Sequence, residues 1–542
     1  MNRSRALARP RWLTRTTPVM VTVTVAAISL AGCSSGSSSS SSPSATPSPT
    51  YASVTSAGAT YKTGMPDQQP EVLTSSNGVL NVTLEAALKP VEISGTMITA
   101  MTYNGKFTSP TLQVNPGDTI NLKLVNNLPE STDLHFHGMH VSPKGNADNI
   151  FVDVQPNTIF DYKITIPADY KPGIAWYHPH WADNEGQVAS GLGGAIIVTG
   201  LKKLLPTDLQ NITEKTLQLK DLQVADGAII NKNIDTNAPT TRTVNGLVNP
   251  TLTIKPGETQ LWNIGNFDAG IYYQVQLTGQ KFYVIGEDGD PVNKVWSADT
   301  LTLPSGKRYS VLVTGPPAGT TTLQTLPFTT GPEGDQYPQV TEATLVSSGD
   351  VQTAATMPVA LAPSPNGQPF FQDLSTAPVA VKRTVTLSQN SESTKFYING
   401  VMFDGNYMYT PQLNTVEEWT VVNKTGELHP FHMHVNPFQV MTINGQPFNA
   451  NSYMDTMSVP GKGTMVFRIK YTDFDGPTVF HCHILAHEEA GMMSAFYILP
   501  PVGAPQPPAS ELKKVPAPVM GMSPSGSGSP STGTMSPSMG AP

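Results

Sequence analysis

The segment Pro110-Thr-Leu-Gln-Val-Asn-Pro-Gly-Asp-Thr119 recurs in the chain as Pro250-Thr-Leu-Thr-Ile-Lys-Pro-Gly-Glu-Thr259. Each copy is a short apolar alternation, a Pro-Gly turn and the start of a second alternating run, which is typical of two β-strands joined by a turn. Pro-Gly turns precede strands in many β-proteins, but a match over the whole segment indicates an internal repeat. A weaker third copy begins at Asn399-Gly400.

The repeat predicts three tandem domains of one kind. The Asn-Gly pairs that precede the copies start at Asn104, Asn245 and Asn399, which are 141 and 154 residues apart. Each unit is long enough for one Greek-key β-sandwich. The composition agrees, because only 13% of the 542 residues are charged while Gly (45) and Pro (49) are frequent, as in strands joined by many turns. We therefore expect an all-β fold of three tandem Greek-key β-sandwiches.

The N-terminus resembles a bacterial lipoprotein signal. Five arginines precede an apolar run over about residues 18–30, which is too short to span a bilayer. The run ends in Leu30-Ala-Gly-Cys33, followed by a serine tract. The resemblance implies cleavage before Cys33 and lipidation of its thiol, hence an exported protein anchored to the bacterial membrane on its periplasmic or outer face. The alternative is an ordinary signal peptide with an incidental cysteine.

The charge and the low-complexity stretches complete the division of the chain. The net charge is −8, and no basic run occurs in the body of the chain, which excludes nucleic acid as an expected partner. The oligomeric state leaves no mark in the sequence. The expected parts are a signal peptide (1–32), a Ser/Pro-rich linker (33–74), three β-domains (75–200, 201–350 and 381–502), a Pro-rich linker (351–380) and a disordered Met/Pro/Ser tail (503–542).

The eleven histidines are grouped, and none lies in the second domain. Residues i and i+2 of a strand point to one face, so each His-x-His pair directs two imidazoles to one place. Four such pairs supply eight imidazoles, enough for a multinuclear metal site between the first and third domains. His140 fits no pair. The clusters are His135-Phe-His137-Gly-Met-His140, His178-Pro-His180, His429-Pro-Phe-His432-Met-His434 and His481-Cys-His483-Ile-Leu-Ala-His487.

The cysteine in the last cluster indicates a second metal site. In a strand, Cys482 faces away from its two neighbouring histidines, so it can bind a different ion. With His429 and His487 it supplies one thiolate and two imidazoles, and Met492 follows ten residues later. A His2Cys set with a weak axial Met is typical of a blue-copper electron-transfer site. Zinc is the usual alternative for Cys/His clusters, but eight further paired histidines argue against one structural zinc.

These four motifs, over about residues 75–500, resemble those of the multicopper oxidases, whose fold is three cupredoxin domains. The resemblance implies four copper ions, one type 1, one type 2 and two type 3. It also implies that a small-molecule donor gives single electrons to the type 1 copper, near the edge of His487 or His429. Electrons then pass through Cys482 to His481 or His483, and dioxygen is reduced to water. The implied ligands are His429, Cys482, His487 and Met492 for type 1, His135 and His432 for type 2, and His137, His178, His180, His434, His481 and His483 for type 3.

Proton delivery and the reducing substrate are less clearly marked. Glu488 matches a position where the family often has an acid, and Asp148 is a second candidate for proton delivery, although both could be ordinary surface carboxylates. Cuprous oxidases of the family have Met where this chain has Glu427. Thioethers that suit Cu(I) do occur, Met402 and Met408 in one loop and Met454 and Met457 around Asp455. We therefore expect a laccase-like oxidase of phenolic or aromatic compounds or of low-valent metal ions. A cuprous oxidase, or a copper-sequestering lipoprotein in copper tolerance, is the alternative.

Overall fold

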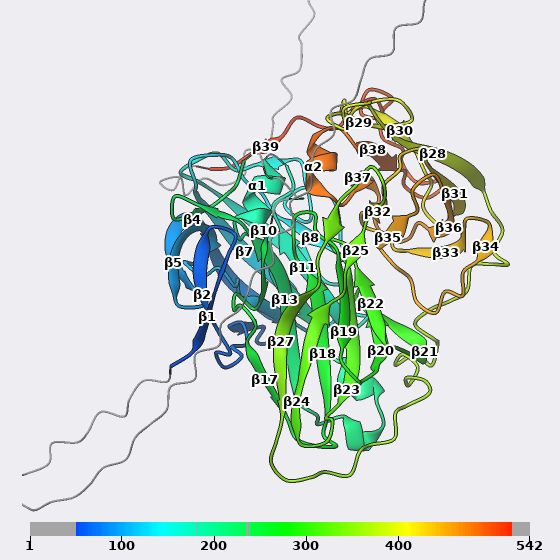
Figure 1. Cartoon of the computed structure of the whole chain (residues 1–542). Helices are drawn as coiled ribbons and strands as arrows, with labels where there is room; N and C mark the ends of the chain where they lie inside the picture. The colour runs from blue at the N-terminus through cyan, green and yellow to red at the C-terminus, as the bar shows by residue number, and fades with distance from the viewer. Residues whose placement is uncertain (1–49, 182, 233, 235–236, 238, 523–542) are drawn as a thin grey trace, which may run out of the picture. The chain divides into compact units, whose positions relative to one another are not determined.

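A computed structural model describes residues 50–522, apart from residues 182, 233, 235–236 and 238. Over residues 51–522 the chain forms three β-sandwiches, each built from a six-stranded and a five-stranded sheet (Figure 1). This confirms the expected all-β fold of three tandem sandwiches. The described residues contain only short helices, including α1 (Asn184–Ala189) and α2 (Leu485–Glu489) beside the histidine clusters.

The core of the first domain lies between its two sheets, where apolar residues from alternate strand positions meet. Its six-stranded sheet has the order β10 (Thr158–Thr165), β7 (Thr119–Asn127), β4 (Val79–Ile93), β5 (Thr96–Tyr103), β15 (Ala228–Ile229), β14 (Val224–Ala225). Its five-stranded sheet has the order β3 (Val72–Thr74), β6 (Thr111–Val114), β12 (Gly194–Val198), β11 (Gly173–His178), β8 (His135–His137).

The second domain repeats this arrangement without histidines. Its six-stranded sheet has the order β16 (Thr241–Val244), β13 (Glu214–Leu222), β18 (Thr259–Asn266), β23 (Arg308–Thr314), β20 (Phe282–Glu287), β21 (Asp290–Ala298). Its five-stranded sheet has the order β17 (Thr251–Ile254), β27 (Val340–Ser347), β24 (Gly319–Thr325), β19 (Tyr273–Leu277), β22 (Thr300–Leu303). Smaller elements are the 3-10 helices η1 (Leu201–Leu204) and η2 (Thr207–Leu209), and the strand pair β25 (Phe328–Thr329) and β26 (Gln336–Tyr337).

The third domain shares one continuous apolar cluster with the second. Its six-stranded sheet has the order β29 (Phe396–Ile398), β28 (Val381–Gln389), β31 (Val416–Asn423), β36 (Thr464–Lys470), β33 (Phe438–Ile443), β34 (Gln446–Pro447). Its five-stranded sheet has the order β30 (Tyr407–Tyr409), β38 (Met493–Ile498), β37 (Gly476–Cys482), β32 (His429–Met433), β35 (Thr456–Val459).

The sequence repeat corresponds to equivalent strands, and one asparagine explains part of its pattern. Asn126, Asn266 and Asn423 each lie at or one residue before the end of the strand that follows the repeated turn, and each is buried. In all three domains the side-chain amide of this asparagine donates to two main-chain carbonyls, one in the connection that follows and one much further along the chain. A buried amide group of this kind satisfies carbonyls that would otherwise be stranded, so the same residue recurs at the same place.

The linker expected over residues 33–74 is partly wrong. Within it, β1 (Ala52–Ser56) and β2 (Ala59–Thr63) form an antiparallel hairpin, and β3 joins the first domain. Tyr61 is fully buried in an apolar cluster with Val91 and Val224. The prediction failed because it was based on the serine-rich composition of the segment, which gives no sign that a single tyrosine is buried. Cys33 and the expected signal peptide, residues 1–32, lie outside the described residues.

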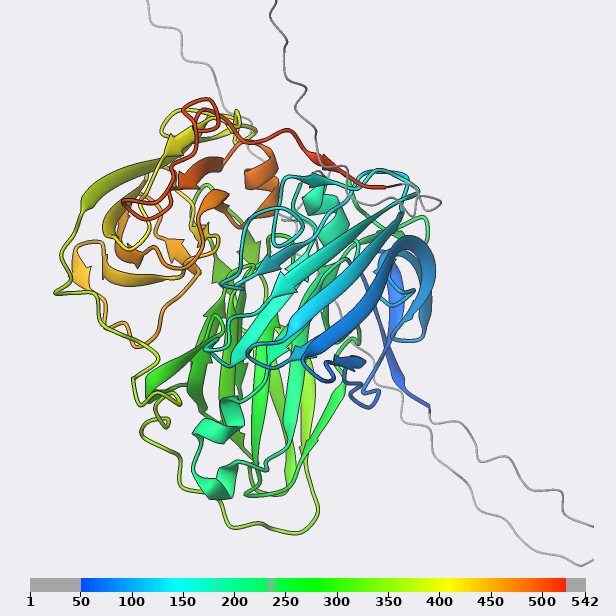
Figure 2. The same ribbon diagram turned by 180° about the vertical axis from the view of Figure 1, so that it is seen from behind.

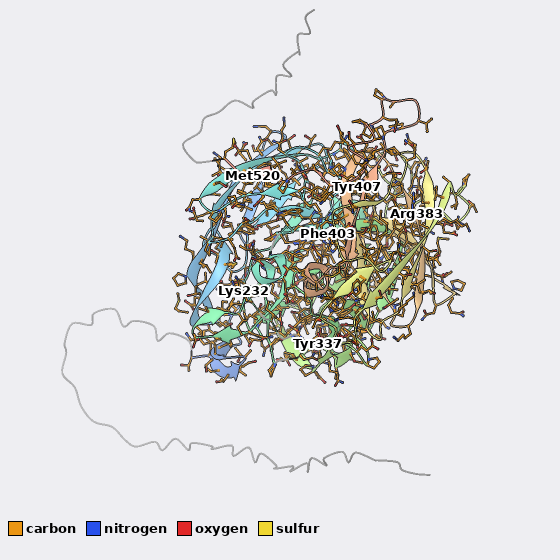
Figure 3. The ribbon with its side chains drawn as sticks, turned by 90° about the horizontal axis from the view of Figure 1, so that it is seen from above. Lys232, Tyr337, Arg383, Phe403, Tyr407 and Met520 are labelled. Atoms are coloured by element: carbon orange, nitrogen blue, oxygen red, sulfur yellow. The ribbon has the colours of Figure 1, made fainter. Side chains whose placement is uncertain are left out.

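The tail expected to be disordered over residues 503–542 is also partly wrong. Residues 503–522, here called the C-terminal strap, run from the third domain to the first (Figure 2). At one end the Val515 amide donates a hydrogen bond to the Gly405 carbonyl. At the other end β39 (Val519–Met520) pairs in parallel with β9 (Val152–Asp153). Figure 3 shows Met520 at the first domain and Tyr407 at the third. Residues 523–542 lie outside the described part.

The described residues contain no helix that is both long and apolar enough to cross a bilayer.

Truncation tests the C-terminal strap. A chain ending at residue 502 loses the pairing of β39 with β9 and the packing of the half-buried Val515 against Phe151 and Ala495. We expect its free energy of unfolding to fall by about 1 kcal/mol, the order of one partly buried aliphatic side chain. A chain ending at residue 522 keeps these contacts and serves as the control. Equal thermal stability of the two truncated proteins would refute a clamping role for the strap.

Candidate metal centre

The eight paired histidines lie where the first domain meets the third. β8 pairs with β11 in the first domain, so His135 stands opposite His178. β32 pairs with β37 in the third domain, so His432 stands opposite His481. Rings of the two domains stack on each other, His135 on His434 and His137 on His432, each with centroids 3.9 Å apart. All eight imidazoles are buried, and the His-x-His pairs converge as expected. Only the pair His135 and His137 lies wholly within a strand, because His180, His434 and His483 each follow the end of theirs.

The imidazoles fall into groups whose nitrogen atoms face one another. One triple is His137, His178 and His483, and the distance from His483 Nε2 to His137 Nδ1 is 3.1 Å. His135 and His432 form a further group with His137, in which the ligand nitrogens lie within 4.8 Å of one another. The other triple is His180, His434 and His481; its Nε2 atoms lie 3.1 Å (His434 to His481) and 3.2 Å (His180 to His481) apart.

Most of these rings are held at the nitrogen that points away from the shared centre. A hydrogen bond at one nitrogen fixes the tautomer and leaves the other nitrogen with a free lone pair. Burial and the neighbouring imidazoles lower the pKa of His135, His178 and His434 well below the ordinary value, so the rings are neutral. The partners are Asp148 for His135, Asp455 for His137, the Pro179 carbonyl for His178, the Asp455 carbonyl for His432, the Cys482 carbonyl for His481 and Ser305 for His483.

This arrangement fits metal ions. Neutral imidazole nitrogens that face each other at 3.1–3.2 Å repel unless a proton or a cation lies between them. Among the described residues, His135 Nε2, His178 Nε2 and His432 Nε2 are buried without a hydrogen-bond partner, which is costly for polar atoms. Imidazole donors in these numbers suit copper.

A second, separate group surrounds the cysteine. Cys482 Sγ lies 3.5 Å from His429 Nδ1 and 3.8 Å from His487 Nδ1, and the two nitrogens are 3.3 Å apart. Thr425 Oγ1 lies 2.8 Å from His429 Nε2, so it holds that ring from behind. Burial raises the pKa of the Cys482 thiol well above its ordinary value, so its thiolate needs a bound cation.

Met492 and Met493 lie on opposite sides of the chain, which distinguishes them as ligands. Met492 is fully buried in the same apolar cluster as Cys482, and main-chain hydrogen bonds tie it to Cys482 and His487. Met493 packs instead against Val479 in another cluster. The side of the strand therefore favours Met492 as the axial donor, in agreement with the spacing in the sequence.

Glu488 and Asp148 are buried beside histidines, so neither is a surface carboxylate. Glu488 Oε2 lies 2.8 Å from His481 Nδ1. Burial raises the pKa of Glu488, but the neighbouring His481 and His180 outweigh it and the net shift is downward. Asp148 Oδ1 lies 3.0 Å from His135 Nδ1, and burial raises the pKa of Asp148 to about 7. His140 stands apart from the clusters, with Nε2 2.8 Å from Asp473 Oδ2.

Three buried residues at the clusters were not predicted from the sequence. Asp455 contacts His137 and His432, Ser305 contacts His483, and Arg308 binds Asp455. None of them belongs to a histidine motif, and two come from the domain that has no histidine. A weak signal was present in Gly138, directly after His137, because a Cβ there would overlap the Arg308 guanidinium.

The methionines considered as Cu(I) ligands are dispersed. Met402 and Met408 line a small surface cavity of about 170 Å³ together with Met493. Met454 is buried in the apolar core, and Met457 is half-buried against it.

Comparisons with known proteins agree with this geometry. Three family models, each described as multicopper oxidase, match residues 86–203, 205–348 and 376–502. Multicopper oxidase mco of Staphylococcus haemolyticus (strain JCSC1435) is 28% identical over 452 residues, covering 78% of this chain and 90% of the relative. The laccase of Bacillus subtilis (strain 168) is 25% identical, covering 74% and 90%.

A solved structure described as a multicopper oxidase from Campylobacter jejuni, a metallo-oxidase, is similar with a TM-score of 0.69 and 25% identity, covering 81% of this chain and 96% of that one. The structure of a laccase from Pediococcus acidilactici is similar with a TM-score of 0.69 and 26% identity, covering 81% and 95%.

Proposed function

This chain belongs to the multicopper oxidase family, and from that premise we propose which of its residues hold the coppers, accept the donor and deliver protons. The protein is a laccase-like oxidoreductase that uses dioxygen and four copper ions, one type 1, one type 2 and two type 3. Bound copper supplies the one-electron chemistry and the four-electron reduction of dioxygen to water. The protein contributes the ligand geometry and the surroundings of each ion.

The proposal rests on three consecutive residues, His481, Cys482 and His483, which belong to different metal-binding groups. At the end of the extended strand β37, Cys482 belongs to the single-cysteine group, while His481 before it and His483 just after the strand belong to two different histidine triples. A single peptide bond on either side of Cys482 therefore joins the proposed type 1 site, which would receive electrons, to the proposed type 3 ligands, where they would be used. The proposed ligands are His429, Cys482, His487 and Met492 for type 1, His135 and His432 for type 2, His137, His178 and His483 for one type 3 ion, and His180, His434 and His481 for the other.

The donor is proposed to approach His487. The His487 side chain is 13% exposed, whereas His429 is fully buried, so only His487 offers an edge to solvent. Phe396 stacks on the His487 ring with centroids 4.0 Å apart and holds it in place. Glu427 Oε2 lies 3.7 Å from His487 Nε2.

The Glu427 side chain beside this edge is only 6% exposed, and burial raises its pKa to about 8. A carboxyl whose pKa lies near neutral pH favours donors that release a proton with the electron. A phenol or an aromatic amine can bond through its O–H or N–H to Glu427 while its ring lies near His487. Low-valent metal ions are a second class that an acidic group accepts. The alternatives of a cuprous oxidase or a copper-sequestering protein are less well supported, because storage needs no complete set of ten imidazoles and the thioethers Met402 and Met408 line a separate cavity.

Glu488 and Asp148 are the proposed proton donors to the dioxygen site. Each carboxyl touches a histidine of the clusters from the side away from the facing nitrogens. A buried acid within hydrogen-bond distance of the ligands can pass protons inward without opening the site to bulk water.

Replacing the cysteine tests the ligand assignment. We expect Cys482→Ser to abolish the blue thiolate-to-copper absorption near about 600 nm and to stop dioxygen uptake with a phenolic donor, while the circular dichroism stays that of a β-protein. Thr478→Ser, a buried change on the same strand, is the control and should keep both properties. Blue colour that survives in Cys482→Ser would disprove the type 1 assignment.

Replacing Glu427 tests the donor site. We expect Glu427→Gln to lower kcat/KM for a phenolic donor by about 100-fold, the lower end for loss of a general base, with the blue absorption unchanged. Turnover of ferrocyanide, which gives an electron without a proton, should stay the same. Glu333→Gln is a matched control, since Glu333 binds the Gly426 amide instead of facing His487. Equal losses for both donors would mean that Glu427 acts on the copper site and not on the proton.

Export and anchoring are proposed from Cys33, which lies outside the described residues. Small residues before the cysteine and the apolar run upstream support cleavage and lipidation, which would tether the enzyme to the bacterial membrane on its periplasmic or outer face. The intact protein should then partition into the detergent phase in Triton X-114 extraction, and Cys33→Ser should move it to the aqueous phase. Aqueous partitioning of the unaltered mature protein would contradict the anchor.

A further inference from the structure

The second domain has no histidine, yet its turn between β22 and β23 lies against the histidine clusters. Its residues, here called the 304–308 turn, are Pro304, Ser305, Gly306, Lys307 and Arg308. We propose that this turn selects which nitrogen of His483 and of His137 is free to bind a type 3 copper. Ser305 acts on His483 directly, and Arg308 acts on His137 through Asp455. The inference rests on the ligand assignment proposed above and adds a positioning role for a domain without ligands.

The hydrogen bonds of the Ser305 hydroxyl determine which ring nitrogen of His483 carries the hydrogen. The Ser305 hydroxyl donates its single hydrogen to the main-chain carbonyl of Asp268, which can only accept. Its oxygen lies 3.0 Å from His483 Nδ1, so Nδ1 must carry the hydrogen of that bond. His483 Nε2 is left with its lone pair, and this atom is the one that faces His137 Nδ1.

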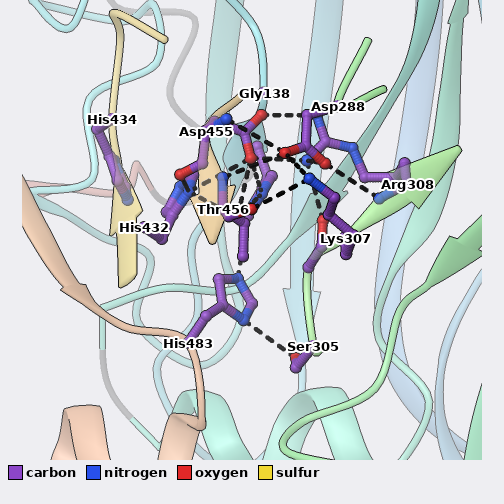
Figure 4. Close-up of polar contacts among 12 residues, drawn as sticks. Gly138, Asp288, Ser305, Lys307, Arg308, His432, His434, Asp455, Thr456 and His483 are labelled. Atoms are coloured by element: carbon purple, nitrogen blue, oxygen red, sulfur yellow. Dashed lines mark hydrogen bonds and ion pairs between the residues drawn. The ribbon is translucent and has the colours of Figure 1, made fainter. Parts of the chain in front are cut away.

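Arg308 determines the orientation of His137 through one carboxylate. Arg308 Nη1 and Nη2 donate to Asp455 Oδ1 and Oδ2 at 2.8 and 2.7 Å, a bidentate pair in which the arginine is fully buried and the aspartate nearly so (Figure 4). This fork holds the carboxylate plane in one position. Asp455 Oδ1 then accepts from His137 Nε2 at 3.2 Å, so Nδ1 is the nitrogen that His137 presents to the shared centre.

Two glycines let the turn and the ligands approach this closely. Gly306 has φ +84°, and a Cβ there would lie 2.9 Å from His137 Cε1 and 3.1 Å from His483 Nε2. Gly138, directly after His137, has φ +82° and leaves the space that the Arg308 guanidinium fills. The two contacts are reciprocal, one glycine on each side of the interface.

The turn is also fixed in place, as a positioning element requires. Lys307 pairs with Glu287 and Asp288 at 2.8 and 2.9 Å, and all three side chains are buried. Arg308 Nε donates to the main-chain carbonyl of Ile174 on β11, the strand that ends at His178. Arg308 therefore touches all three domains, and its charge is balanced within the interface.

A merely structural role predicts a different result from a positioning role. If the turn only packs the domains together, a substitution in it lowers the stability of the protein. Its copper is then bound as tightly as in a protein with a comparable buried substitution elsewhere. If the turn selects the tautomer, its loss frees His483 to rotate or to carry the hydrogen on Nε2, and the copper on that triple binds more weakly. Partners of this kind are typically worth about 10- to 100-fold in metal affinity.

The test compares Ser305→Ala with Ser310→Ala in the copper-loaded, full-length protein. Ser310 is buried on β23, five residues further along, and its hydroxyl binds Asn263 and touches no histidine. Each protein is dialysed against a graded copper chelator, and the loss of type 3 copper is followed by copper content and near-ultraviolet absorption. Type 1 copper is followed by the blue colour, and the thermal midpoint of each metal-free protein is measured separately.

We expect Ser305→Ala to lose type 3 copper at about 10- to 100-fold less chelator than Ser310→Ala, with the blue colour lost at the same point in both. Arg308→Lys keeps the charge but not the fork, so it should shift type 3 copper in the same direction. Equal chelator midpoints for Ser305→Ala and Ser310→Ala would overturn the positioning role while leaving the oxidase assignment intact. Failure of the unaltered protein to acquire type 3 copper would instead refute the proposed function.

Discussion

Alternation of side chains along an extended strand is the constraint on which the metal sites depend. At the end of β37 it places Cys482 in one site and His481, with His483 just after the strand, in the other, so that two sites share consecutive residues. The same rule places His135 and His137 of β8, and His432 of β32 with His434 just after that strand, at the interface of the first and third domains. A helix could not provide this arrangement, because its neighbours at i and i+2 point in different directions.

Burial gives these imidazoles their chemical character. The rings are shielded from water and crowded together, which disfavours their protonated form. Most are bound at one nitrogen by a carboxylate, a hydroxyl or a carbonyl, so the other nitrogen is left facing its neighbours. A set of inward lone pairs is unfavourable in the empty protein and favourable around cations. The free energy of metal binding thus compensates for the buried polar atoms that the fold leaves without partners.

The metal site is formed by the interfaces between the domains and not by any single domain. The first and third domains supply the imidazoles, and the second supplies Ser305 and Arg308 behind them. The C-terminal strap adds a connection on the outside, from Gly405 of the third domain to β9 of the first. Because each contribution comes from a different part of the chain, the site forms only when all three sandwiches have docked.

The sequence alone determined the fold class, the number of domains and the four groups of histidines, because strand alternation and the repeated turn are local patterns that need no tertiary information. It also separated Cys482 from its neighbours and favoured Met492 by spacing. Only the tertiary structure divided the six type 3 candidates into two triples and made His487, not His429, the exposed ring. It likewise revealed Ser305, Arg308 and Asp455, and it anchored residues judged flexible by composition. These features depend on contacts between residues more than a hundred positions apart, and no local pattern encodes such contacts.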